Sequence, residues 1–364
     1  MKSHAIIPIF LPHEGCRNDC VFCNQKTITA RGRLPEPGAV RATIGEYLDT
    51  IRGRGIQTVE IAFFGGSFTG MPVEIQTTYL AIARDFKSRG EIDKIRLSTR
   101  PDYINDEILG LLKAYSVDII ELGVQSLDDG VLALSNRGHD SACVIRSAAL
   151  IKSYGFTLGI QLMIGLPGDT FEKSVLSAEK TVAIGPDIAR IYPTIILRDT
   201  ELEKMYRRGD YAPLDLEEAV RTAKAMCLAL RGAGINVIRI GLKSSDFVAE
   251  GKDAMGGTYH PAFRQLVEGD IIRDILEGQL AALIAATGDG TYLRHACATF
   301  FCSPDSLSDM IGHKKRNRLY FETKYSPMHF NFRTDPALAE GCFRTSIDVG
   351  DAGPQGGSER FACL

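Results

Sequence analysis

The sequence predicts an α/β fold in which a parallel sheet curls into a full or partial barrel. Short runs rich in β-branched residues recur along the first two thirds of the chain, and the segments between them have helical patterns of about 10–15 residues. Strands that alternate with such helices form a parallel sheet, because each strand is followed by a right-handed crossover through a helix. In such folds the reactive groups lie in the loops after the carboxyl ends of the strands.

The expected elements follow one another regularly as far as residue 240. We expect strands at residues 5–10, 58–64, 94–98, 118–124, 157–164, 188–192 and 236–240. We expect helices at residues 72–86, 106–115, 141–154, 171–184 and 216–233.

The regular alternation stops after about Lys243. Gly256 and Gly257 indicate a loop, residues 262–286 indicate one or two helices, and a shorter helical piece surrounds residues 306–312. From Arg333 onward Gly, Pro and Ser are frequent and periodicity is lost, which is typical of a disordered tail. We therefore expect a barrel over 1–245, a small mainly helical C-terminal extension over 246–332, and a disordered tail over 333–364.

The composition is that of a globular protein without a general attraction for polyanions. Of 364 residues, 45% are apolar and 24% charged, and the net charge is −3. No apolar run approaches the roughly 20 residues of a membrane span. Ile6–Pro12 is too short for a signal peptide. We expect a cytoplasmic protein with no membrane partner.

The cysteines are the strongest chemical signal. There are nine, and without an export signal they indicate thiols or metal ligands and not disulfides. Cys16, Cys20 and Cys23 have the spacing C-x3-C-x2-C directly after the first expected strand. Three thiolates in so short a loop can bind one face of an iron–sulfur cube and leave one iron open. The alternatives are unliganded thiols or a structural zinc site, for which His13 is the nearby fourth ligand.

With this spacing and placement, residues 5–245 resemble the radical SAM superfamily. The resemblance implies a partial (β/α)6-type TIM barrel with a [4Fe–4S] cluster on Cys16, Cys20 and Cys23. It also implies that S-adenosylmethionine binds the open iron. An electron from the cluster then cleaves S-adenosylmethionine and produces a 5′-deoxyadenosyl radical, which removes hydrogen from a substrate. A reducing partner such as flavodoxin or ferredoxin is implied as well.

The resemblance also implies which residues contact the cofactors. Gly65-Gly66-Ser67 follows the second strand and is similar to the family's GGE-type motif, which holds the methionine amino group, although Ser67 replaces the glutamate. As in coproporphyrinogen dehydrogenase, an arginine pairs with the methionine carboxylate and polar side chains hold the ribose. Ser98 and Gln161 stand where those relatives carry acidic residues. The expected cofactor contacts are Phe22, Gly65, Gly66, Ser67, Ser98, Gln125, Arg137 and Gln161.

Longer stretches indicate a branch within the superfamily. Ser98–Tyr103, Glu121–Ser126 and Ile191–Leu202 resemble the Elongator catalytic subunit, which modifies the wobble uridine of transfer RNA. We find no loop of the type that binds acetyl-CoA at a helix N-terminus, so the resemblance is to that branch without its acetyltransferase domain. Transfer RNA is accordingly a candidate substrate.

Several alternatives remain open at this point. The radical could act on a small molecule such as a tetrapyrrole, or the protein could be a non-enzymatic cluster-bearing sensor. The basic segment 313–318 could hold phosphates or be a solvated helix face. A second cluster could involve the remaining C-terminal cysteines, Cys297, Cys302, Cys342 and Cys363.

Overall fold

The computed structural model describes residues 4–11, 16, 18–24, 34–242, 254–286, 296–348 and 358–363. It divides into two compact units, Met1–Pro261 and Ala262–Leu364. The division falls after the expected boundary at residue 245, because residues 254–257 pair with a strand of the first unit. Among the described residues, no helix is long and apolar enough to cross a membrane.

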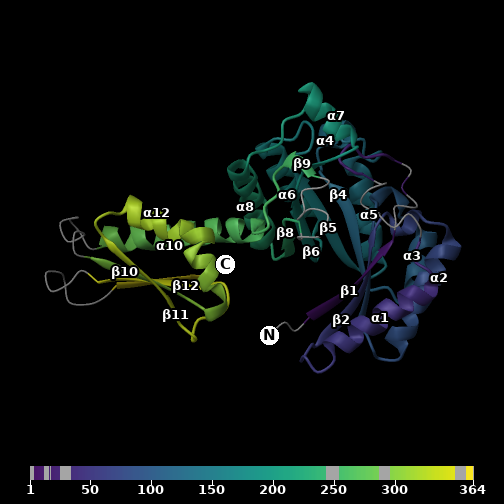
Figure 1. Cartoon of the computed structure of the whole chain (residues 1–364), viewed down its shortest axis with the longest axis horizontal. Helices are drawn as coiled ribbons and strands as arrows, with labels where there is room; N and C mark the ends of the chain where they lie inside the picture. The colour runs from purple at the N-terminus through teal and green to yellow at the C-terminus, as the bar shows by residue number, and fades with distance from the viewer. Residues whose placement is uncertain are drawn as a thin grey trace. The chain divides into compact units, whose positions relative to one another are not determined.

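The first unit is built on a seven-stranded parallel sheet, as expected for a partial barrel (Figure 1). Its order is β1-β2-β3-β4-β5-β6-β8, so consecutive strands are neighbours and β1 and β8 stand at the two ends. All seven strands lie where the sequence predicts them. Their bounds are β1 His4–Leu11, β2 Thr58–Gly65, β3 Lys94–Thr99, β4 Ile119–Gln125, β5 Thr157–Ile164, β6 Ile188–Pro193 and β8 Asn236–Ile240.

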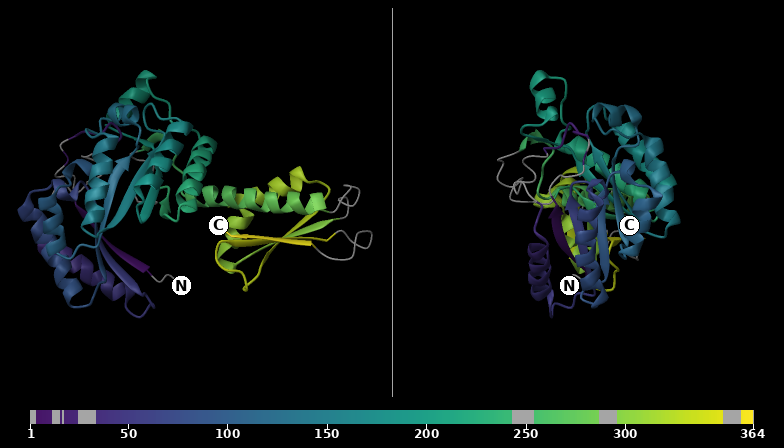
Figure 2. Two further views of the ribbon diagram at one scale, coloured as in Figure 1. Left: turned by 180° about the vertical axis from the view of Figure 1, so that it is seen from behind. Right: turned by 90° about the vertical axis from the view of Figure 1, so that its right-hand side faces the viewer.

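Helices cover one face of this sheet, as the two views from opposite sides show (Figures 1 and 2). The five helices expected from periodicity are confirmed as α2 Val73–Ser88, α3 Asp106–Ala114, α5 Ser141–Ser153, α6 Phe171–Ile184 and α8 Leu216–Gly232. Among the described residues of the first unit, three more helices lie outside these five ranges, namely α1 Pro37–Ile51, α4 Asp129–Leu134 and α7 Glu201–Arg208. Two of these are short, and a helix of two turns carries too little periodicity to be recognised.

Polar caps determine where most of these helices begin. Each cap accepts a hydrogen bond from the backbone N–H three residues later, which satisfies one of the free donors of the first turn. The capping residues are Asn105, Asp128, Asp140, Thr170, Thr200 and Asp215. They hold the loops at the carboxyl ends of the strands in fixed conformations, and these loops carry the candidate site.

Gly256 and Gly257, where the sequence predicted a loop, belong to a strand of a small antiparallel sheet. There β7 (Ile195–Leu197) pairs with β9 (Ala254–Gly257). A β-carbon on Gly257 would lie 2.8 Å from the Ile195 Cα, so the glycine permits the close approach of the two strands.

The second unit contains the helices expected of the C-terminal extension together with a four-stranded sheet. Two strands of this sheet lie in the stretch 333–364, which the sequence predicted to be a disordered tail. Strands β10 (Cys297–Cys302), β11 (His329–Thr334), β12 (Cys342–Asp348) and β13 (Ser358–Cys363) form the sheet in the order β11-β10-β12-β13. The described part of residues 333–364 is therefore mostly strand. The reason is a period-two pattern: Ala298, Phe300 and Cys302 are buried while the residues between them are half-buried.

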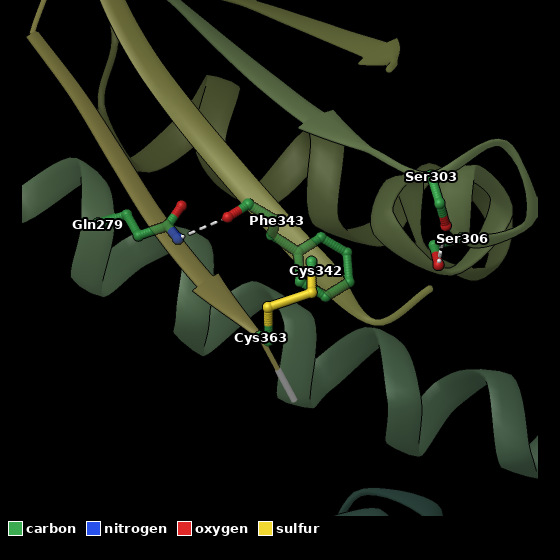
Figure 3. The surroundings of a disulfide bond; sticks show 6 residues. All are labelled: Gln279, Ser303, Ser306, Cys342, Phe343 and Cys363. Atoms are coloured by element: carbon green, nitrogen blue, oxygen red, sulfur yellow. Dashed lines mark hydrogen bonds between the residues drawn. A yellow bond between two sulfur atoms is a disulfide. The ribbon is translucent and has the colours of Figure 1, made fainter. Parts of the chain in front are cut away.

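One long helix packs on this sheet. Helix α10 (Phe263–Ala286) lies across the strands beside α12 (Arg316–Lys324), with α11 (Leu307–Ile311) between them in sequence (Figures 1 and 2). The core between helix and sheet is aliphatic and aromatic and includes Leu276, Leu280, Phe300, Phe321 and Phe343. The Gln279 amide donates a hydrogen bond to the Phe343 carbonyl at 3.0 Å, and a disulfide joins Cys342 to Cys363 (Figure 3). Both of those thiols are thus engaged, which leaves Cys297 and Cys302 as the free C-terminal cysteines.

Candidate functional site

The cysteine turn is fastened to segments far away in sequence. The Val21 N–H donates to the Ser135 carbonyl at 3.2 Å, and the Val21 carbonyl accepts from the Leu202 N–H at 2.8 Å. The Asn24 side chain donates to the Arg198 carbonyl at 2.6 Å. The turn is therefore held between the segment after α4 and the start of α7, over the carboxyl ends of the central strands.

Apolar residues of the cysteine turn pack into a small buried cluster. Val21, Leu202 and Tyr211 are buried together with Ile196, and Phe22 packs against them. Phe22, which the resemblance placed near the cofactor, thus has at least a structural role. The turn itself is tight, since the Cys23 N–H donates to the Cys20 carbonyl at 3.0 Å.

The three cysteine thiols lie close enough to influence one another. Burial, together with the nearby sulfurs of Cys20 and Cys16, raises the pKa of Cys23 to about 12. Burial also raises the pKa of Cys16, whose thiolate would accept a hydrogen bond from the Ser67 N–H. Thiols that oppose one another's ionisation are stabilised as thiolates when they bind a metal.

This donor set fits an iron–sulfur cluster. Within the described ranges, no three or more His, Cys, Asp or Glu side chains converge as ligands of one metal ion. A four-iron cube is larger than a single ion, so its three ligands need not converge on one point. His13, the fourth ligand of the zinc alternative, lies outside the described residues.

Two guanidinium groups converge on Cys20. The Arg137 Nη1 donates to the Cys20 Sγ at 3.0 Å, and the Arg100 Nη1 lies 3.8 Å from the same sulfur. Both arginines are 4% exposed. In a buried site a cation so close to sulfur favours the thiolate. Arg137 was expected near the cofactor, whereas Arg100 was not.

The glycine turn after β2 is built against the end of β1. Gly65 has φ +118, and a β-carbon there would lie 2.0 Å from the Leu11 carbonyl oxygen. The Gly66 N–H donates to that same carbonyl at 3.3 Å. Only glycine fits at residue 65, and the turn consequently brings Gly66, Ser67 and Ser98 to the wall of one small recess beside Leu11.

The Ser67 hydroxyl is already used by the protein. It accepts from the Arg100 N–H at 2.9 Å and lies 3.3 Å from the Thr99 hydroxyl. The Thr99 hydroxyl is in turn 2.6 Å from that of Thr69. Serine at this position therefore stabilises the rim between β2 and β3, and its backbone remains to contact a ligand.

The remaining expected residues meet at the ends of β4 and β5. Gln125 has φ 70, and the pairing of β4 with β5 shifts register between Gly123 and Gln125. This irregularity places the Gln125 Oε1 within 3.1 Å of the Gln161 Nε2. The Arg137 Nη2 donates to the Gly123 carbonyl at 2.5 Å, so Gln125, Arg137 and Gln161 form one group.

A chain of buried ion pairs connects the strands β2, β3, β4 and β6 of the sheet. Arg96 pairs with Glu60 at 2.7 Å and also with Glu121, which Arg190 contacts at 2.8 Å. Gly159 leaves room for the Glu121 side chain of this chain of ion pairs, since a β-carbon on Gly159 would lie 2.7 Å from the Glu121 Cγ. Two arginines and two carboxylates cancel in charge, which makes their burial tolerable.

Sequence reasoning missed Arg100 and Tyr211. The stretch Ser98–Tyr103 was singled out as a branch signature, but no role was assigned to its arginine. Tyr211 donates to the Gly165 carbonyl at 2.6 Å and so fixes the loop after β5. A single tyrosine after a short helix carried no signal of this contact.

Two family models match the chain. The Radical SAM superfamily model matches residues 10–178, and the Radical SAM C-terminal domain model matches residues 186–273. Together they cover more than half of the chain.

Curated relatives extend the match. The tRNA uridine(34) acetyltransferase of Methanocaldococcus infernus is 27% identical over 250 residues, which are 58% of this chain and 46% of that protein. Elongator complex protein 3 of Homo sapiens is 28% identical over 249 residues, which are 57% of this chain and 46% of that protein. The chain thus spans about half the length of these curated relatives.

A solved structure supports the fold. The structure of M. infernus Elp3 with an N-terminal deletion has a TM-score of 0.61 at 19% identity and covers 76% of this chain and 64% of that one. At this identity the likeness concerns the fold alone. From the two family models, the parallel half-barrel and the Elongator-type relatives, we conclude that the chain belongs to the radical SAM superfamily of enzymes.

Proposed function

We propose that Cys16, Cys20 and Cys23 hold a [4Fe–4S] cluster with which the chain cleaves S-adenosylmethionine reductively. The observation that carries this proposal is the partly buried cysteine turn, whose three thiols lie together and whose Cys20 sulfur faces two arginines. When bound, the cluster supplies the electron that breaks the C5′–S bond and leaves a 5′-deoxyadenosyl radical to take hydrogen from a substrate. A low-potential protein such as flavodoxin or ferredoxin would deliver that electron.

The residues around the turn would bind and orient S-adenosylmethionine. The backbone of Gly65 and Gly66 can approach a ligand closely, and carbonyl groups there can accept from an ammonium. Arg137 would take the methionine carboxylate through its Nε, which is buried and makes no hydrogen bond to the described residues.

The polar groups at the ends of β3, β4 and β5 would hold the ribose. Gln125 and Gln161 present linked amides, and Ser98 is partly exposed beside them on the neighbouring strand. Gln125 is 5% exposed, so the group lies largely out of water. A carbon radical attacks most groups that it meets, and a dry site protects it.

The direct test is anaerobic reconstitution with iron and sulfide. We expect about four irons per chain, and 5′-deoxyadenosine that forms only when reductant and S-adenosylmethionine are present. Cys20→Ser should lose both together. Cys143→Ser is the matched control, because Cys143 is a free cysteine of α5 that contacts Ser147 and not the turn. A chain that binds no iron, or a Cys20→Ser variant that retains turnover, would contradict the proposal.

We further propose transfer RNA as the substrate. The support is the similarity, over about 250 residues, to relatives named tRNA uridine(34) acetyltransferase. Phosphates could bind the basic segment, since Lys314 and Lys315 are exposed just before α12. Transfer RNA bound through its phosphates to this segment should dissociate more readily as the salt concentration rises.

Binding of bulk transfer RNA at several salt concentrations tests this substrate. Lys314→Gln should weaken binding and reduce the salt slope by about 0.7–0.9 per lost phosphate contact. Lys94→Gln, an exposed lysine at the start of β3, should leave binding unchanged. If transfer RNA does not bind while 5′-deoxyadenosine still forms, a small molecule such as a tetrapyrrole becomes the better candidate.

A further inference from the structure

We propose that Arg100 is a positioning residue for the cluster, and that its charge and N–H groups set the reduction potential of the cluster and help retain it. The inference rests on the proposed function, since it concerns the cluster that Cys20 would hold. It assigns a role to a residue that neither the cysteine motif nor the expected cofactor contacts include.

Arg100 faces Cys20 from a dry position. Its Nη1 lies 3.8 Å from the Cys20 Sγ, within the range of a hydrogen bond to sulfur. Arg100 is 4% exposed and Cys20 is 8% exposed. Where water is excluded, a cation at this distance acts strongly on a thiolate, because little solvent screens it.

The guanidinium of Arg100 is held in place without help from the sulfur. Its Nε and Nη2 donate to the two oxygens of Asp102 at 2.9 Å and 3.0 Å, which is the bidentate arrangement that arginine makes best. Its Nη2 also donates to the Arg137 carbonyl, and the group lies 5.5 Å from the centre of the Tyr103 ring. The donor aimed at Cys20 is therefore preorganised.

Arg100 and Arg137 have different expected tasks. Arg137 lies closer to Cys20, but its free Nε would be drawn to the cofactor carboxylate, whose negative charge offsets its own. Arg100 is tied to Asp102 on the side away from the sulfur. The positive end of that ion pair thus faces Cys20 and its negative end lies behind.

This arrangement gives opposite signs for two substitutions. The potential of an iron–sulfur cluster depends on net charge and on hydrogen bonds to its sulfurs. Removing the cation in Arg100→Gln should make one-electron reduction harder and lower the midpoint potential. Removing the anion behind it in Asp102→Asn should raise the midpoint potential, because the charge of Arg100 is then less compensated.

The experiment compares reconstituted full-length wild type with Arg100→Gln, Arg100→Lys and Asp102→Asn. The readouts are the midpoint potential, from a redox titration followed by electron paramagnetic resonance, and the rate at which a chelator removes iron. We expect Arg100→Gln to lose iron about 10-fold or more faster, as is typical when a partner of a metal ligand is removed. Arg100→Lys should restore part of both properties. Arg84→Gln is the control. Arg84 belongs to helix α2 and, like Arg100, lies over a tyrosine ring, in this case that of Tyr115.

Each outcome decides between the claims. A wild-type potential and iron-loss rate in Arg100→Gln would overturn the inference while the cluster itself stands. A fall in potential in both Arg100→Gln and Asp102→Asn would show that Arg100 only supports the fold. Wild type that binds no iron would refute the proposed function and this inference with it. If Arg100→Gln does not fold, the other two variants still test the inference. The midpoint potential should fall slightly in Arg100→Lys and rise in Asp102→Asn, and shifts of the same sign would overturn the inference.

Discussion

Replacing Gly65 with alanine places a methyl group where the structure has no room. The new β-carbon would lie 2.0 Å from the Leu11 carbonyl oxygen, and the backbone φ of +118 is one that residues with side chains rarely adopt. The obstacle is backbone and not a flexible side chain, so β1 or β2 must move. Leu11 ends β1 just before the cysteine turn, which makes this a test of how the strand supports the site.

Three costs contribute to the loss of stability. The strained backbone costs about 1–3 kcal/mol. Separation of the strands loses the hydrogen bond from the Gly66 N–H to Leu11, about 1 kcal/mol, and displacement of packed neighbours costs about 1–3 kcal/mol more. We therefore expect the free energy of unfolding to fall by about 3–7 kcal/mol, a large part of the roughly 5–15 kcal/mol of a typical domain.

The matched control is Gly90→Ala. Gly90 has φ +72 but nothing within 4 Å of the new β-carbon, so only a backbone cost of about 1–2 kcal/mol applies. Urea unfolding of both variants under anaerobic conditions measures the difference, and iron content after reconstitution measures the effect on the turn. The reasoning would be refuted if Gly65→Ala were no less stable than Gly90→Ala and bound as much iron.

Three further predictions concern other parts of the chain. Tyr211→Phe removes the buried hydrogen bond to Gly165 and should lower the free energy of unfolding by about 1–3 kcal/mol in urea, and no change would show that the contact is unimportant. Burial lowers the pKa of His139 to about 4, so as pH falls from 6.5 toward 4 the unfolded chain takes up the proton first. Stability should fall by up to about 3 kcal/mol across that window, and an equal fall in His139→Gln would disprove this cause. Cys342→Ser opens the loop that the bond to Cys363 closes over a sequence separation of 21, and should cost the second unit about 3 kcal/mol in thermal or urea unfolding. Strong reductant should do the same to wild type, and a stable reduced protein would contradict the estimate.

The strands of the barrel could be predicted because each is recognisable by itself. A strand of a parallel sheet is covered on both faces and reads as a short continuous apolar run, as in Thr157–Ile164. The pairing of β7 with β9 could not be predicted, since each strand has at most four residues and its partner lies in a distant segment. The C-terminal sheet was missed for a related reason: its strands lie among Gly, Pro and Ser, which hid the period-two burial of β10 and β12.

The candidate site likewise has one part that the sequence predicts and another that only the fold determines. The spacing of Cys16, Cys20 and Cys23 predicts a metal-binding turn, because three thiolates on eight consecutive residues can reach one cluster wherever the rest of the chain lies. The place of Arg100 beside Cys20 depends on β3 lying next to β2 and on the bonds to Asp102 and the Arg137 carbonyl.

The sequence by itself therefore determined the class of protein: a parallel half-barrel of the radical SAM superfamily with a cysteine turn after its first strand. These features depend on local pattern, and apolar runs or closely spaced cysteines can be recognised in the sequence without knowledge of the fold. Only the tertiary structure decided which charges surround Cys20, that Ser67 supports the rim, and that the last residues pair as strands. Those facts depend on contacts between residues far apart in sequence, whose distances follow from packing and have no counterpart in their spacing along the chain.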